Sequence, residues 1–198
     1  VLIKKSQETG RTIYILSDEP YRKISYGTEV PSIMAIYPHT TCATSYSKDL
    51  SLPGERIGHL AIHPEAEDAE NLINAAVLCN RVLGYVNAPA MMQRLVAQMQ
   101  GRSVDIELYT KKRDLLCQGL SDIGYQFIKP EGTFYLFCEA PGGDDVAAVD
   151  ALQKELILTV PGRGFASPGY FRISFCVADS VIQNALPGFE RAFKALQQ

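Results

Sequence analysis

The sequence lacks the features by which membrane, secreted and nucleic-acid-binding proteins are usually recognised. No apolar run approaches the ~20 residues that a transmembrane helix needs. The first ten residues, VLIKKSQETG, contain no small-residue cleavage site of a signal peptide. A net charge of −3 provides no excess of basic side chains for nucleic acid or an anionic membrane surface. These absences favour a globular cytoplasmic protein that binds neither nucleic acid nor a membrane.

The cysteines and histidines form none of the common disulfide or metal-binding patterns. The five cysteines are odd in number and widely spaced, no CxxC pair occurs, and the three histidines include no HExxH. A disulfide framework and a zinc site are therefore disfavoured, and we expect no metal ligands. Most of the cysteines lie in apolar runs, so we expect small buried side chains in a reducing compartment.

The first part of the chain predicts strands followed by helices. Three short runs rich in apolar and β-branched residues, separated by Gly- and Pro-containing loops, are typical of buried strands: 12–17, 40–46 and 57–62. Because these runs are apolar on both faces, they indicate a mostly parallel sheet covered by helices. Helical spacing then follows over 64–86, over 88–100 and over about 102–120, with Asn87 predicted to cap the second helix.

The rest of the chain mixes strands and helices in α+β fashion. Strands are predicted within 124–141, 157–162 and 170–175, and a short capped helix over 143–156. A closing helix is predicted over 179–196, which Pro187 should kink or split. The change of pattern places a domain boundary near residues 90–105.

Several polar side chains stand where a ligand would bind. Asp18 and Tyr21 follow a predicted parallel strand, at the end where open α/β sheets bind ligands. Lys48 ends a buried run, where burial would favour a neutral, nucleophilic amine, although a solvated loop lysine is the ordinary interpretation. Arg56 borders an apolar strand, and its fork of donors suits a carboxylate or a phosphate. Arg172 lies inside an aromatic strand and needs either a structural acid or an anionic ligand.

Taken together and in order, the motifs SDEPYRK, SYSKDLSLPGERIGHL and PGYFRISF resemble one family. The chain resembles the C-terminal half of a class I/II aminotransferase, a fold type I pyridoxal-phosphate (PLP) enzyme of the aspartate aminotransferase type. The resemblance implies an α/β fold: the C-terminal part of the three-layer PLP-transferase large domain over 1–98, then a small α+β domain over 99–198. It also implies amino-group transfer between an α-amino acid and a 2-oxo acid.

The resemblance assigns roles around the cofactor. In that family the lysine of the S-x-x-K motif forms a Schiff base with PLP and later moves a proton at the substrate's Cα, which here is Lys48. Asp18 matches the aspartate that pairs with the pyridine nitrogen and keeps it protonated. Tyr21 matches the tyrosine that hydrogen-bonds the 3′-oxygen of the cofactor.

The resemblance also assigns the residues that bind anions. Ser45 and Arg56 match the serine and arginine that hold the cofactor phosphate. Arg172 matches the arginine that binds the α-carboxylate of the substrate through two parallel hydrogen bonds.

The resemblance covers only the later part of the family's architecture. The chain opens on Val1 without a methionine, so we expect it to be part of a longer protein. The resemblance implies that the longer protein forms a homodimer. The 198-residue piece alone is expected to bind PLP weakly and not to transaminate. Two alternatives remain open: a PLP-dependent C–S lyase or related β-eliminating enzyme, and an aminotransferase-like domain of a regulator.

Overall fold

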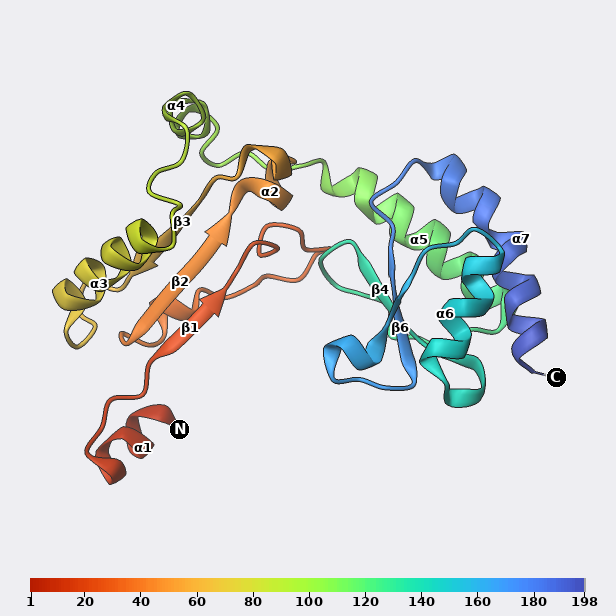
Figure 1. The fold of residues 1–198 in the computed structure, drawn as a ribbon, viewed down its shortest axis with the longest axis horizontal. Helices are drawn as coiled ribbons and strands as arrows, with labels where there is room; N and C mark the ends of the chain where they lie inside the picture. The colour runs from red at the N-terminus through yellow and green to blue at the C-terminus, as the bar shows by residue number, and fades with distance from the viewer. Residues whose placement is uncertain (198) are drawn as a thin grey trace. The chain divides into compact units, whose positions relative to one another are not determined.

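The computed structural model describes residues 1–197, which form two compact units, one over Val1–Val104 and one from Asp105 onward. Each unit has its own three-stranded sheet and its own helices (Figure 1). Among the described residues, no helix combines the length and the apolar character needed to cross a membrane. The identification of 1–98 and 99–198 as the family's large and small domains stays a prediction.

The first unit is built around the sheet β1-β2-β3. Its strands are β1 (Ile15–Asp18), β2 (Thr40–Ser45) and β3 (Gly58–Ile62). Its helices are α1 (Leu2–Thr9), α2 (Tyr46–Asp49), α3 (Ala69–Val82) and α4 (Ala90–Gln98), with short 3-10 turns η1 (Ile33–Ala35) and η2 (Pro53–Glu55). Helix α1 has no counterpart in the sequence predictions.

The expected parallel arrangement holds for β1 and β2, whereas β3 runs antiparallel to β2. A parallel neighbour needs a crossover that carries the chain back along the whole strand. The residues between Ser45 and Gly58 instead fold into α2 and η2, so β3 starts at the end of the sheet where β2 stops.

The helix that follows α3 begins later than predicted. Pro89, not Asn87, is the N-cap of α4, and its carbonyl accepts the first helical hydrogen bond from the Gln93 N–H at 3.0 Å. The proline disfavours helical dihedrals at Ala88, which stands before it, so the helix cannot start earlier. The predicted cap at Asn87 is therefore wrong.

The second unit packs three helices against a sheet of order β4-β6-β5. The strands are β4 (Tyr135–Glu139), β5 (Val160–Pro161) and β6 (Tyr170–Ser174). The helices are α5 (Ile106–Ile123), α6 (Asp145–Lys154) and α7 (Asp179–Leu196), with 3-10 turns η3 (Pro141–Gly143) and η4 (Gly162–Phe165). Helix α7 runs through Pro187 as one element, so the predicted split does not occur.

The two faces of this second sheet differ in chemistry. Four side chains of β4 and β6 on one face are buried in the core: Leu136, Cys138, Phe171 and Ile173. The alternate residues of the same strands, among them Tyr135 and Arg172, occupy the opposite face. The helices cover the first face, since α6 contacts β5 and β6 and α7 contacts α5 and α6.

Three of the five cysteines are buried, as the apolar runs around them predicted. Cys42, Cys117 and Cys138 are buried, whereas Cys79 and Cys176 are exposed. Burial raises the pKa of the Cys138 thiol well above its usual range, so this side chain behaves as a small apolar residue.

Candidate functional site

Three of the expected site residues lie at one end of the first sheet. Asp18 ends β1 and pairs with Ala43 of the parallel strand β2, which itself ends at Ser45. Arg56 comes just before β3, whose first residue, Gly58, pairs with Ser45. The carboxyl ends of β1 and β2 and the start of β3 therefore bring Asp18, Ser45 and Arg56 to one edge, where ligands bind in open α/β sheets.

Lys48 and Tyr21 lie together at this same end. Ser45 caps helix α2, with its Oγ accepting a 3.2 Å hydrogen bond from the Ser47 N–H. Helix α2 directly follows β2 (Figure 1) and carries Lys48, whose Nζ lies 5.6 Å from the centroid of the Tyr21 ring. Both side chains are partly buried. The structure thus places Lys48 over an aromatic ring, unlike an ordinary solvated loop lysine.

The turn that carries Lys48 is anchored by its neighbour, Asp49. The Asp49 side chain is buried, and its Oδ2 lies 3.0 Å from the Lys23 Nζ. Its backbone carbonyl accepts a 2.7 Å hydrogen bond from the Val104 N–H. Because these contacts hold both the side chain and the backbone of Asp49, they also fix the backbone of the preceding residue, Lys48, at this end of the sheet.

Arg56 adopts a backbone conformation that is uncommon outside glycine. Its φ is +50° and ψ is +48°, in the left-handed region, and its Nη1 donates a 2.8 Å hydrogen bond to the Pro53 carbonyl. The side chain is exposed, and within residues 1–197 it forms no ion pair with a carboxylate. This guanidinium is therefore suited to an external anion.

Gly58 is a residue of this edge that the sequence predictions did not single out. A Cβ at this position would lie 2.4 Å from the Thr44 carbonyl oxygen and 3.1 Å from the Ser45 Cα. Only glycine allows β3 to approach Ser45 this closely. The available signal was a lone glycine inside the run RIGHL, because a glycine within a strand often marks a close backbone approach.

Arg172 belongs to the second unit and is surrounded by aromatic rings. It lies on the central strand β6, opposite Phe137 on β4 and Val160 on β5. Its guanidinium carbon lies 4.2 Å from the centroid of the Tyr135 ring and 4.3 Å from that of Phe165. No carboxylate within residues 1–197 forms an ion pair with it. The structural acid that sequence considerations allowed is therefore not found in the described chain.

Tyr135 and Phe165 were not proposed from the sequence as site residues. The alternation of TFYLF places Tyr135 and Phe137 on one face of a strand, and this pattern could have identified Tyr135. Phe165 lies in the loop GRGFASPG, where no periodicity indicates which way a side chain points.

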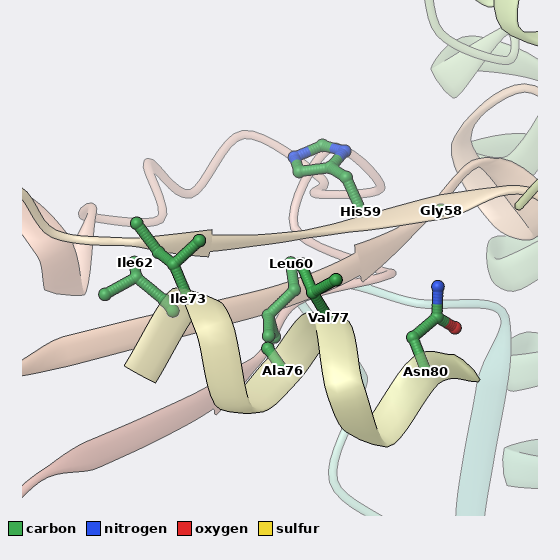
Figure 2. Close-up of a pocket in the computed structure, with 8 residues that line it drawn as sticks. All are labelled: Gly58, His59, Leu60, Ile62, Ile73, Ala76, Val77 and Asn80. Carbon is green, nitrogen blue, oxygen red and sulfur yellow. The ribbon is translucent and has the colours of Figure 1, made fainter. Parts of the chain in front are cut away.

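A separate cavity in the first unit is mostly apolar. It has a volume of about 650 Å³ and lies between β3 and α3. In Figure 2, Leu60 and Ile62 of β3 lie against Ile73 and Val77 of α3, whereas His59 points away from the helix. None of the residues expected to bind cofactor or substrate lines this cavity.

The opposite face of β2 and β3 borders a more polar cavity of about 580 Å³. Thr44 and His59 line it, together with Asp49 of α2. The His59 Nδ1 lies 3.2 Å from the Tyr46 hydroxyl, which also accepts a 3.2 Å hydrogen bond from the Gln100 Nε2. These contacts link α2 to β3 and to the turn after α4, and help to fix the helix that bears Lys48.

Comparison with known proteins identifies the family of the chain. The family described as "Aminotransferase class I and II" matches residues 6–188. Aspartate aminotransferase of Thermotoga maritima is 27% identical over 183 residues, covering 91% of this chain and 47% of the relative. Aspartate/prephenate aminotransferase of Thermus thermophilus is 28% identical over 184 residues, covering 90% and 47%.

Solved structures give the same result for the fold. A crystal structure of an amino transferase from Eubacterium rectale superposes with a TM-score of 0.93 at 43% identity, covering 100% of this chain and 50% of that one. The mixed α/β fold expected from the sequence is thereby confirmed. The chain spans about half the length of the curated relatives it matches. It belongs to the class I and II aminotransferase family.

Proposed function

We propose that the whole protein is a PLP-dependent aminotransferase that moves an amino group between an α-amino acid and a 2-oxo acid. Enzymes of this family are generally PLP-dependent. The observation that carries the proposal is the position of Lys48, beside Tyr21 and next to the sheet edge formed by Asp18 and Ser45.

The donor set at this edge fits PLP group by group. A carboxylate, Asp18, suits a protonated pyridine nitrogen, and the Tyr21 hydroxyl suits the phenolic oxygen. The Ser45 hydroxyl and the Arg56 guanidinium suit a phosphate dianion. The Lys48 amine suits the aldehyde, because a primary amine is the one group of this set that can condense with an aldehyde to a Schiff base, with loss of water.

Lys48 is proposed to act twice. Its amine would hold the cofactor by condensing with the aldehyde, with loss of water, and would be free again once the amino group of a substrate takes its place. As a free base, Lys48 would take the proton from the substrate's α-carbon and would later give it back as the conjugate acid. When bound, PLP supplies the electron sink that stabilises the electrons left at that carbon. Asp18 sustains this sink by keeping the ring nitrogen protonated.

Arg172 is proposed to select α-amino acids by binding their carboxylate. A guanidinium presents parallel donors that match both carboxylate oxygens, which a lysine cannot do. The proposal is supported by the absence of an internal ion pair at Arg172 within residues 1–197.

Replacing the lysine tests the proposal. Borohydride treatment of the protein with PLP should attach the cofactor to the peptide that contains Lys48, and Lys48→Ala should abolish this labelling. In the whole protein, Lys48→Ala should lower amino-group transfer to 2-oxoglutarate by about a thousandfold or more, whereas Lys4→Ala, at an exposed position, should not. A Lys48→Ala protein that kept full activity and labelling would refute the assignment.

The same assay separates transamination from elimination. A transaminase makes a 2-oxo acid only when an amino acceptor is present. A C–S lyase would release ammonia and pyruvate without an acceptor.

The family resemblance also supports proposals on the domains, the oligomeric state and the cellular location of the protein. We propose that residues 1–98 belong to the PLP-binding large domain and residues 99–198 form the small domain. The whole protein is proposed to act as a homodimer. Its proposed location is the cytoplasm.

A further inference from the structure

The face of the second sheet that bears Arg172 is mostly aromatic. Because paired residues of antiparallel strands share a face, Tyr135, Phe137 and Tyr170 project on the same side as Arg172. The Phe137 and Tyr170 rings stack with centroids 5.6 Å apart, and Phe165 meets Phe137 edge-on at 6.2 Å. Arg172 is therefore set within a group of rings that contact one another.

Two of these rings contact the cation itself. We call Tyr135 and Phe165 the ring pair, because the Arg172 guanidinium carbon lies 4.2 Å and 4.3 Å from their centroids. A guanidinium over a ring face is attracted by the π-electrons, while its N–H groups point outward in the plane. Ring contact therefore restrains the cation without using the edge that binds a carboxylate.

Phe165 comes from a turn that is itself firmly attached. Its neighbour in η4, Arg163, donates to Asp145 from the backbone N–H at 2.9 Å, from Nε at 3.1 Å and from Nη2 at 2.7 Å. Asp145 is only 1% exposed. At Gly162, which opens η4, a Cβ would lie 2.2 Å from the Ser167 carbonyl oxygen, so the turn is tightly packed.

We propose that Tyr135 and Phe165 are positioning residues that hold the guanidinium of Arg172 in one orientation for a carboxylate ligand. This inference rests on the proposed role of Arg172 in the function above. An unrestrained arginine side chain loses conformational freedom about several rotatable bonds when it binds a carboxylate. Because the ring pair already restrains the free Arg172 side chain, less conformational entropy is lost on binding. The effect of the ring pair should therefore appear in carboxylate affinity rather than in the chemical step.

The orientation of Arg172 can be measured without any catalysis. In the 198-residue chain, the ¹⁵N order parameter of the Arg172 Nε–Hε group, assigned by its absence in Arg172→Gln, should fall in Phe165→Ala and in Tyr135→Ala. Phe165→Tyr and Tyr135→Phe keep the rings and should keep the order parameter. Tyr170→Ala is the matched control, because it removes a ring of the same face that stacks on Phe137.

Carboxylate binding is measured on the same signal by titration with 2-oxoglutarate. Each ring removed should weaken the apparent affinity by about two- to tenfold, with recovery in the ring-preserving variants and no change in Tyr170→Ala. In kinetic assays of the whole protein, KM for the amino acid should rise by a similar factor while kcat changes less.

The outcomes separate this inference from the proposed function. If the whole protein shows no amino transfer but 2-oxoglutarate still shifts the Arg172 signal in a ring-dependent way, the proposed function fails and the positioning role stands. If Phe165→Ala behaves like Tyr170→Ala in order parameter or affinity, the positioning role is wrong. It is equally wrong if 2-oxoglutarate leaves the wild-type Arg172 signal unmoved.

Discussion

At the scale of single residues, Gly58 sets how closely β3 approaches β2. Its missing side chain leaves room for the Thr44 carbonyl, which would lie 2.4 Å from a Cβ. Because the obstructing atom is backbone, Gly58→Ala forces the strands apart and should lower the free energy of unfolding by about 1–3 kcal/mol. The measurement is urea unfolding followed by circular dichroism.

Gly54→Ala is the matched control for Gly58→Ala. Gly54 lies in η2, and a Cβ there would meet no atom within 4 Å. Its replacement should change the free energy of unfolding by less than about 1 kcal/mol, since only backbone entropy is affected. Equal losses from the two substitutions would show that the close approach at Gly58 is not what makes glycine necessary.

The residues of the sheet edge were more predictable than those around Arg172. Asp18 and Ser45 end strands and Lys48 comes shortly after one, so the pattern of apolar runs already placed them near strand ends. Their roles stay predictions, but their location did not need coordinates. Phe165 reaches Arg172 from a turn distant in sequence, and such a contact depends on tertiary packing that periodicity does not encode.

At the scale of elements, η4 is tied to the start of α6 by Arg163, which pairs with the buried Asp145 at 2.7 Å and with the exposed Asp144 at 3.5 Å. Hydrogen bonds from Arg163 hold the pKa of the Asp145 carboxyl well below its usual range. The folded protein thus binds this proton less readily than the unfolded chain. The pair therefore stabilises the fold fully above the ordinary aspartate pKa of about 4, and this contribution is lost as the pH falls.

Asp145→Asn should remove this pH dependence. The variant should have a lower Tm than wild type at pH 7, and this difference in Tm should begin to narrow as the pH falls from 4 toward 3, because the unfolded chain takes up a proton on Asp145 there while the folded carboxylate stays ionised. Asp144→Asn is the control, since asparagine caps a helix equally well and the pair lost with Arg163 is the longer one, 3.5 Å, between two exposed side chains. Thermal unfolding at several pH values measures both. A difference in Tm between Asp145→Asn and wild type that stays constant with pH would show that the ion pair is not the source of this pH dependence.

The helices and strands of the second unit agree closely with those predicted from local sequence patterns, whereas the agreement is poorer in the first unit. Helix α7 spans the predicted 179–196, and α6 begins at the capping residue Asp144, whose Oδ1 accepts from two backbone N–H groups. The direction of β3 and the start of α4 were not predicted. Strand direction depends on how the connection folds, and the start of α4 depends on Pro89 rather than on the stronger-looking cap at Asn87.

At the scale of the whole molecule, the two units have unequal cores. Of the largest fully buried side chains within residues 1–197, only Ile24 and Thr40 belong to the first unit, while Phe171, Phe175 and Phe189 are among those of the second. Along α3, the apolar side chains of Val77 and Val82 are 52% and 77% exposed. Buried apolar area is the main stabilising contribution to a fold, so the second unit should be the more stable in this chain.

Native-state hydrogen exchange at low denaturant should resolve this difference by element. The amides of β6 and α7 should exchange last, and those of α3 should open at a free energy lower by about 2 kcal/mol or more, because less apolar surface holds α3 in place. Agreement of opening free energies obtained at two pH values provides the control that opening is at equilibrium. Protection of α3 equal to that of β6 would show that the exposed face of the helix does not weaken its attachment to the sheet.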